Sequence, residues 1–271
     1  MRRQASPGSL GIRFGQRTID VAGTTRRFLL AEPPGEPVGV VLSLHGSRST
    51  AWRQRLLSGM DRLAADGAVV AFPEGAQRRG RGYVWDPEHD VAFLAGLVES
   101  LLQTYAVAPA GVVITGMSGG ARMACHLASL RSDLVLAVGA VAGLRAPSRT
   151  PLARPVPVIA FHGKADHLNP YAGGGRADWR ESVEEAAVGW AVANGVRPQS
   201  EDDVTPGVRR IAYGLPGSPG EVVLLTIDGA GHTWPGGRLG LLGTLFLGRT
   251  SRAVDATAAI WRFARDRSAV R

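Results

Sequence analysis

Short, continuous apolar runs alternate along this chain with segments whose apolar positions recur every three or four residues. Such runs are typical of strands that are buried on both faces of a parallel sheet. The predicted strands cover residues 27–31, 39–44, 68–72, 112–115, 136–141, 156–161 and 222–227. We expect the first of these to be an antiparallel edge strand, preceded by residues 18–21.

Helices are predicted where the apolar positions fall on one face. One begins near Asp90, a second covers 179–194 and ends at Gly195, and others cover 121–130 and 253–265. Alternating strands and helices predict an α/β fold with a mostly parallel central sheet, helices on both faces and no large lid. The Pro/Gly-rich stretches 145–157 and 206–220 are interpreted as loops within a single domain over 1–271.

The composition adds little that is unusual. With 271 residues, 45% hydrophobic and 20% charged, the chain can bury a large core. Residues 1–15 are expected to be a flexible segment. They lack the apolar region of a signal peptide, and this lack favours a cytoplasmic protein. The alternative is a secreted protein whose leader is absent from this sequence. No run is long enough to span a membrane. Cys125 is the single cysteine and is expected to be buried and inert.

The net charge of +8 comes almost entirely from arginine. Its densest cluster, residues 78–81, lies in a Gly-rich stretch without interleaved aromatic side chains. We interpret it as a solvated loop, which could attract an anionic substrate, and expect no nucleic-acid partner.

The sequence Gly116-Met117-Ser118-Gly119-Gly120 carries the strongest chemical signal. It follows an apolar run and precedes a predicted helix, which is the context of the G-x-S-x-G nucleophile elbow. In that turn a strained serine projects its hydroxyl above the sheet, and the glycines avoid clashes with neighbouring backbone. The alternative is an ordinary glycine-rich strand–helix turn, so the partners of Ser118 decide between them.

An acid and a histidine should follow the serine in that order, each after a strand. Asp166 follows the strand ending at 161, and His232 follows the strand ending at 227. His232 would exchange the serine proton, and Asp166 would hold the imidazole tautomer. Asp228 is the alternative acid and His167 the alternative base. The remaining histidines are interpreted as structural or as part of other loops: His45, His89, His126 and His162.

Two backbone N–H groups should form the oxyanion hole. Gly119 follows the nucleophile, and Ser47 lies after an early strand, in the sequence Leu44-His45-Gly46-Ser47. No metal-ligand spacing or dinucleotide fingerprint is present, so no cofactor or metal is expected. The candidate substrate-binding residues are His45, Trp85, Met117, Tyr171 and Trp234. For Trp85, Tyr171 and Trp234, a place in the core is the alternative.

With these residues in place, the chain resembles the polyhydroxybutyrate-depolymerase and feruloyl-esterase-like branch of the α/β-hydrolases. The matching segments are 42–46, 72–75, 90–94, 113–121, 161–171 and 231–236. The resemblance implies Ser118, Asp166 and His232 as the catalytic triad and a carboxylic ester as substrate. Secreted members often carry disulfides and a polymer-binding module, whereas this chain has one cysteine. A small or oligomeric soluble ester is therefore expected.

Two alternatives to an esterase stay open at this point. An acyltransferase could use the same triad with an alcohol or amine as acceptor, and a binding protein could keep the fold without catalysis. Residues 239–247 are rich in leucine and follow His232 closely. We interpret them as a packed turn, with a mobile apolar flap over the acyl pocket as the alternative. Substrate identity and oligomeric state do not follow from the sequence.

Overall fold

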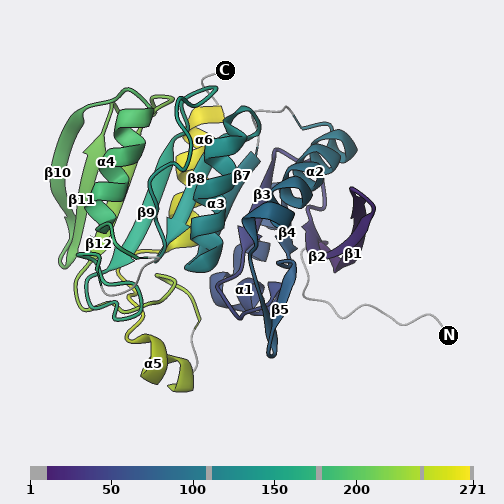
Figure 1. Ribbon diagram of the computed structural model, residues 1–271, viewed down its shortest axis with the longest axis horizontal. Helices are drawn as coiled ribbons and strands as arrows, with labels where there is room; N and C mark the ends of the chain where they lie inside the picture. The colour runs from purple at the N-terminus through teal and green to yellow at the C-terminus, as the bar shows by residue number, and fades with distance from the viewer. Residues whose placement is uncertain (1–10, 108–111, 175–178, 239–240, 269–271) are drawn as a thin grey trace.

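The protein is an α/β structure built on one twisted sheet, as seen in a computed structural model (Figure 1). The structure describes residues 11–107, 112–174, 179–238 and 241–268. Within them, ten strands form the sheet in the order β1-β2-β4-β3-β7-β8-β9-β12-β11-β10. The six central strands, from β4 to β12 in this order, are parallel. The predicted mostly parallel sheet is therefore confirmed.

Most of the central strands lie where the apolar runs predict them. Their bounds are β3 Gly39–Leu44, β4 Ala68–Pro73, β7 Val112–Met117, β8 Ala137–Val141, β9 Val158–Gly163 and β12 Val222–Ile227. Every residue of these strands is buried. Both faces of each strand are covered, which is why the sequence shows continuous apolar runs there instead of alternation.

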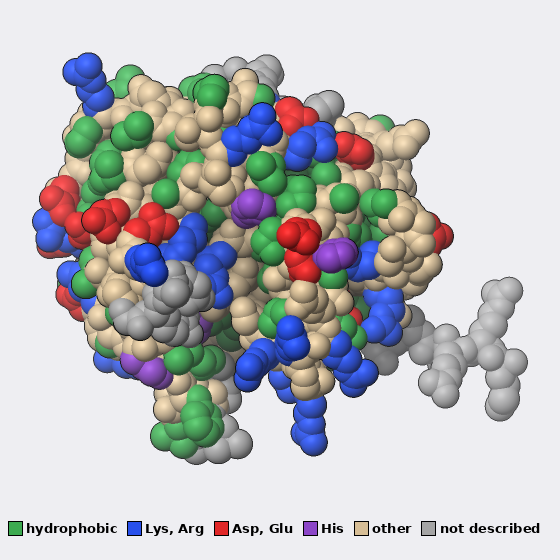
Figure 2. Space-filling view, viewed as in Figure 1, with side chains coloured by type: hydrophobic (Ala, Val, Ile, Leu, Met, Phe, Trp, Pro, Cys, Tyr) green, Lys and Arg blue, Asp and Glu red, His purple; other side chains and the backbone are tan. Residues whose placement is uncertain are grey.

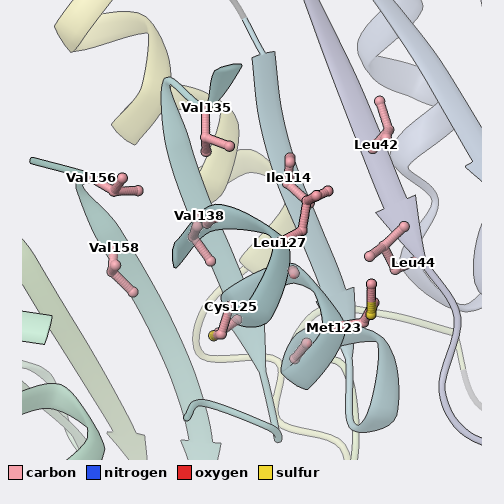
Figure 3. Packing of buried hydrophobic residues seen from close by; sticks show 14 of the residues in the cluster. Leu42, Leu44, Ile114, Met123, Cys125, Leu127, Val135, Val138, Val156 and Val158 are labelled. Atoms are coloured by element: carbon pink, nitrogen blue, oxygen red, sulfur yellow. The ribbon is translucent and has the colours of Figure 1, made fainter. Parts of the chain in front are cut away.

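Two layers of helices cover the sheet. On one face α2 (Pro87–Tyr105), α3 (Gly119–Leu130) and α4 (Val183–Ala193) contribute to a single apolar core, part of which Figure 3 shows beneath α3. On the other face α1 (Ala51–Ser58), the 3₁₀ helix η1 (Met60–Asp66) and α6 (Ala256–Ser268) cover a second core. Cys125 is buried in the first core, and burial raises the pKa of its thiol to about 12, as expected for an inert cysteine.

Capping residues set where two of the helices begin. The sequence placed the start of α2 near Asp90, but Asp86 caps it through the N–H of Glu88, and Pro87 occupies its first turn. The helix predicted from residue 179 begins at Val183, because Ser182 and Glu185 form a capping box there. Both starts follow from side-chain hydrogen bonds, which the spacing of apolar residues does not report.

Antiparallel strands close both edges of the sheet. β1 (Arg13–Val21) pairs with β2 (Thr24–Glu32), as the sequence suggested for that edge. At the other edge lie β11 (Val208–Tyr213) and β10 (Pro198–Thr205), which the sequence did not predict. The stretch 206–220, taken as a loop, therefore contains a strand. The side chains of β10 are largely polar and exposed, so this edge strand lacks the apolar pattern of the core.

The expectations for the N-terminal segment and for the arginine cluster 78–81 need correction. The flexible segment was predicted to extend to residue 15, but β1 already begins at Arg13; residues 1–10 lie outside the described residues. The arginine cluster 78–81 does not lie in a loop alone. It forms the end of β5 and the turn of a short hairpin of β5 (Gln77–Arg79) and β6 (Gly82–Val84), whose three-residue strands are too short to show a hydrophobic periodicity.

No helix in the described part of the chain has both the length and the apolar content that a bilayer span requires.

Candidate active site

Ser118 lies in a strained turn between β7 and α3. Its backbone angles are φ 55° and ψ −118°, a region that residues with a side chain rarely adopt. The N–H of Ser118 donates to Val141 O at 2.8 Å, so the turn is fastened to the end of the neighbouring strand β8. This local geometry is what the nucleophile elbow requires.

The glycines around Ser118 are required by close backbone contacts. A Cβ at Gly116 would lie 2.5 Å from the carbonyl carbon of Gly120, at the start of α3. A Cβ at Gly120 would lie 2.3 Å from Leu44 O, at the end of β3. Both distances are too short for carbon, so α3 can approach the strands this closely only because these positions lack side chains.

Asp166 and His232 meet at the carboxyl edge of the sheet. His232 Nδ1 lies 2.7 Å from Asp166 Oδ2, and both residues are buried. The other oxygen, Oδ1, accepts the N–H groups of Leu168 at 2.9 Å and Asn169 at 2.8 Å. Burial alone would raise the pKa of Asp166, but the hydrogen bond from His232 and the N–H of Asn169 lower it below its ordinary value. The carboxylate is therefore ionised at neutral pH.

The end of β8 connects this pair to the elbow. Ser118 N–H donates to Val141 O, and the side chain of Asn169 donates to the next carbonyl, Ala142 O, at 2.7 Å. The turn of Ser118 and the loop of Asp166 are thus hydrogen-bonded to two consecutive residues, Val141 and Ala142, at the end of β8. Among the described residues no hydrogen bond joins the Ser118 hydroxyl to His232. Such catalytic contacts often tighten only when a substrate is bound.

The predicted oxyanion donors lie against each other. A Cβ placed on Gly119 would be 3.1 Å from Ser47 N, so the two backbone segments are in contact. Within the parts of the chain that the structure describes, neither N–H has a protein acceptor. Two adjacent backbone donors without acceptors, next to a nucleophile elbow, are the arrangement that stabilises a developing oxyanion.

His45 holds the loop that contains Ser47 in place. It is fully buried, and because Gly75 N–H donates to Nε2 at 3.1 Å, the ring proton is on Nδ1, which donates to Gly46 O at 2.8 Å. Trp85 stacks on the ring with centroids 4.6 Å apart, and its Nε1 donates to His45 O at 2.7 Å. The side chain therefore positions the loop and is not exposed to a substrate.

The hairpin of β5 and β6 supports the same loop from outside. Arg48 N–H donates to Tyr83 O at 2.8 Å, and Tyr83 N–H donates to Ser49 O at 2.8 Å. A Cβ at Gly82 would lie 2.2 Å from Arg48 O, so the hairpin packs directly on the loop backbone. The arginine cluster thus belongs to an element that fixes the position of Ser47.

The burial of His45 makes a prediction about stability and pH. Desolvation lowers its pKa from 6.5 to about 4, so the unfolded chain binds this proton more readily than the native protein. The free energy of unfolding is therefore unaffected by protonation of His45 above pH 6.5. It falls as the pH drops from 6.5 toward 4, by roughly 3 kcal/mol in total. Urea unfolding at pH values across this window should show the loss.

The matched control is His89, whose side chain is exposed. His45→Gln should be less stable at neutral pH and lose less stability on acidification, whereas His89→Gln should behave as the wild type. Equal pH dependence in the wild type and His45→Gln would contradict the assignment of a neutral, buried His45.

A cavity of about 450 Å³ opens beside the oxyanion donors. Its lining includes Ser47, Trp85, Gly119, Arg122, His126 and Arg145. This volume lies in the range of sites that hold small organic molecules. Of the predicted substrate-binding residues, the structure places Trp85 in this lining.

The other substrate-binding candidates lie elsewhere. Trp234 is fully buried and its Nε1 donates to Thr257 Oγ1 at 3.0 Å, and Met117 belongs to the second core, so neither faces the cavity. Tyr171 packs against the first core and donates its hydroxyl to Glu184 at 2.7 Å. For Trp234, Met117 and His45 the expectation is corrected, because these buried residues support the site from the core instead of lining it. Tyr171 is only partly buried and does not belong to the described lining of the cavity.

The alternative acid and base are not in the arrangement that the chemistry needs. Asp228 is exposed and pairs with Lys164 at 3.2 Å, and His167 is exposed. His162 is buried, with Nε2 2.8 Å from Asn169 O, which fits the structural interpretation. The sequence analysis did not identify Asn169. It lies three residues after Asp166, the spacing of a turn in which an aspartate side chain accepts backbone N–H groups, and this spacing could have pointed to it.

The segment after His232 projects from the body of the protein. Residues 241–247 form α5 (Leu241–Leu247), and Leu239 lies outside the described residues. Leu245 and Phe246 are 73% and 72% exposed, so for them the interpretation as a packed turn is wrong. Figure 2 shows hydrophobic side chains on this projection, near the bottom of the view. His232 N–H donates to Leu247 O, so α5 is tied to the loop of His232. A mobile flap stays a prediction.

One group of potential metal ligands occurs among the described residues, formed by Asp86, Glu88 and His89, whose ligand atoms lie within 4.8 Å of one another. Asp86 caps α2 through Glu88 N–H and contacts His89 Nδ1 at 3.0 Å. Helix capping accounts for this cluster, and we assign no ion to it.

Comparison with known proteins agrees with this geometry. A family model described as "Putative esterase" matches residues 23–202. The chain is 30% identical over 254 residues to "Putative esterase NocK" of Nocardia uniformis subsp. tsuyamanensis, covering 82% of this chain and 74% of the relative. It is 27% identical over 199 residues to "Feruloyl esterase B" of Piromyces equi, covering 65% of this chain but 35% of that protein.

Solved structures support the fold. Acetyl xylan esterase from Aspergillus awamori matches with a TM-score of 0.63 at 16% identity, covering 81% of this chain and 94% of that one. An S-formylglutathione hydrolase from Agrobacterium tumefaciens matches with a TM-score of 0.55 at 14% identity, covering 97% of this chain and 98% of the other. At such identities the likeness concerns the fold, which is that of the α/β-hydrolase esterases.

Proposed function

Because this chain belongs to the esterase family and is a carboxylic ester hydrolase of the α/β-hydrolase fold, we propose that it works through an acyl-enzyme on Ser118. The observation that carries the proposal is the 2.7 Å contact between His232 Nδ1 and Asp166 Oδ2. These residues come from loops that are distant in the chain. The loops follow β9 and β12, whose carboxyl ends lie at the same edge of the parallel sheet as the end of β7, where Ser118 turns.

The chemistry follows from the roles of the three side chains. Nε2 of His232 accepts the proton of the Ser118 hydroxyl as Oγ attacks the ester carbonyl carbon. The carbonyl oxygen becomes an oxyanion, stabilised by the N–H groups of Gly119 and Ser47. When the intermediate collapses, the bond to the alcohol oxygen breaks, and His232 returns its proton to the leaving alcohol.

Water then repeats the sequence on the acyl-enzyme. His232 accepts a proton from the attacking water, the bond between Oγ and the acyl carbon breaks, and Ser118 regains its proton as the acid leaves. Throughout, the buried carboxylate of Asp166 keeps the proton of His232 on Nδ1 and stabilises the imidazolium. The cavity of about 450 Å³ suits a small or oligomeric ester better than a solid polymer surface.

Labelling with a fluorophosphonate tests the proposed nucleophile. The probe reacts with activated serines, so peptide mass spectrometry should find one adduct, on the peptide that contains Ser118. The variant Ser118→Ala should stay unlabelled under the same conditions. An adduct on another serine, or an unlabelled wild type that is fully folded, would count against the acyl-enzyme.

A further inference from the structure

A closed ring of hydrogen bonds involves two residues that line the cavity beside the oxyanion donors, His126 and Ser148. His126 Nδ1 lies 2.7 Å from Ser148 Oγ, and Ser148 Oγ lies 2.7 Å from Ser129 Oγ. The hydroxyl of Ser129 in turn donates to the backbone oxygen of His126 at 2.8 Å. The ring of hydrogen bonds therefore begins and ends on the same histidine.

The backbone oxygen of His126 sets the direction of these hydrogen bonds. A carbonyl oxygen only accepts, so Ser129 uses its single hydroxyl proton there. Ser129 Oγ must then accept the proton of Ser148, and Ser148 Oγ must accept a proton from His126 Nδ1. In the neutral imidazole the ring proton is therefore on Nδ1, and Nε2 carries a lone pair.

Nε2 of His126 is consequently a hydrogen-bond acceptor at neutral pH. Partial burial lowers the pKa of the ring below its ordinary value, so the neutral form prevails. Within the described ranges of the chain, no protein donor reaches Nε2, and it is not one of the polar atoms buried without a partner. The half-buried ring thus brings an accessible acceptor to the cavity lining.

The two arginines of the lining have partners within the protein. Arg122 and Arg145 both interact with other protein groups. The guanidinium of Arg145 lies 3.7 Å from the ring centroid of Trp179, and its Nε lies 3.8 Å from Glu181 Oε1. These interactions give the arginines a structural role, so we consider substrate recognition by His126 instead.

The cavity follows one face of α3 from the oxyanion donor Gly119 toward His126. Gly119, Met123 and His126 are spaced at i, i+4 and i+7 and line it from the same side of the helix. With a rise of about 1.5 Å per residue, His126 lies about 10 Å along the helix from Gly119. The apolar part of the lining includes Trp85, Pro87 and Met123. An apolar segment of a substrate would therefore lie along Met123, with a polar group at its end.

We propose that His126 is a specificity-determining residue, and that the preferred substrate is an ester with a hydroxyl group about 7–10 Å from the ester carbonyl, which donates to Nε2. The inference rests on the proposed function, because the N–H groups of Ser47 and Gly119 mark where the carbonyl lies. A site that hydrogen-bonds a substrate hydroxyl discriminates against the analogue that lacks it, since its own polar atom is then left unpaired.

The hydroxyl belongs either to the acyl half or to the alcohol half of the ester, and two sets of substrates distinguish these cases. The first set is methyl hexanoate, methyl 6-hydroxyhexanoate and methyl 6-methoxyhexanoate. The second set is the monobutyrate esters of 1-hexanol, 1,6-hexanediol and 6-methoxyhexanol. The methoxy compounds have an oxygen at the same place but no proton to donate. The set in which the wild type prefers the hydroxyl identifies the half that lies along α3.

His126→Phe removes the acceptor and keeps an aromatic ring. In the responsive set, the wild type should favour the hydroxy ester over both analogues in kcat/KM, and His126→Phe should lower that preference about three- to tenfold, as expected for loss of one neutral hydrogen bond. Ser148→Ala removes the acceptor of Nδ1–H, so the ring tautomer is no longer fixed and part of the preference should be lost. The matched control is His89→Phe, at an exposed histidine outside the described lining, which should leave the preference unchanged.

NMR of the imidazole nitrogens separates this inference from the acyl-enzyme proposal. In the wild type, ¹⁵N shifts should show the His126 proton on Nδ1, and titration with the uncleaved amide N-methyl-6-hydroxyhexanamide or with N-(6-hydroxyhexyl)butanamide should move the Nε2 signal. N-methylhexanamide and N-hexylbutanamide should not move it. This result would support the subsite even if Ser118→Ala kept full activity and so refuted the acyl-enzyme. A proton on Nε2, equal kcat/KM within both substrate sets, or an unchanged preference in His126→Phe would overturn the subsite and leave the acyl-enzyme intact.

Discussion

Replacing Ser118 with alanine should lower kcat for a nitrophenyl ester by roughly 10⁴-fold or more. Without the hydroxyl, no acyl-enzyme forms, and only the oxyanion donors and substrate binding remain to accelerate attack by water. The fold should persist, because among the described residues the side chain of Ser118 makes no hydrogen bond. The release of nitrophenolate measures the rate, and thermal unfolding checks the fold.

The matched control for this substitution is Ser200→Ala, on the exposed edge strand β10. It removes the same hydroxyl far from the carboxyl edge of the sheet, so activity should stay at the wild-type level. A folded Ser118→Ala that retained even a few per cent of the wild-type rate would remove Ser118 from the mechanism.

Replacing Asp166 with asparagine should lower kcat by about 10³- to 10⁴-fold, although the two side chains have the same shape. Oδ1 of Asp166 accepts two backbone N–H groups, from Leu168 and Asn169, and Oδ2 faces His232 Nδ1. The single oxygen of asparagine would take the place of Oδ1, so its NH₂ group would face His232. That donor requires an unprotonated Nδ1, which moves the ring proton to Nε2 and prevents His232 from accepting the serine proton.

Asp228→Asn is the control for this prediction, because Asp228 is the other acid near the last central strand. It is exposed and pairs with Lys164, so the substitution should change kcat little. Large loss in Asp228→Asn together with near-normal activity in Asp166→Asn would exchange their roles. The tautomer of His232 can be followed in both variants by ¹⁵N NMR of the ring.

The central sheet was predictable because each of its strands is buried on both faces. Val40 and Leu42 face one core and Val41 the other, so the strand must be apolar throughout, and a continuous run reports it. β10 and the hairpin of β5 and β6 carry no such signal, since their residues are largely exposed and depend on neighbours for pairing. Helix interiors were predicted by the same logic, whereas caps such as Asp86 and Ser182 set their true starts.

The candidate reactive residues could be located in the sequence for a different reason. A nucleophile elbow needs glycines within two residues of the serine, and an acid and base need to follow strands in a set order, so the requirements appear locally in the sequence. The walls of the cavity have no such local requirement. An aromatic residue close in sequence to His232, such as Trp234, faces the core or a cavity according to how distant segments pack around it.

The sequence by itself therefore determined the fold class, the order in which Ser118, Asp166 and His232 follow central strands, and the candidate roles of these three residues. Only the tertiary structure decided that His45 is a buried support for the loop of Ser47 and that Arg122 and Arg145 line one cavity. The physical reason is that backbone geometry and strand burial restrict residue types position by position. Whether a side chain such as His45 is exposed, and whether Arg122 of α3 lies near Arg145 of the loop after β8, is decided only when separate elements pack together.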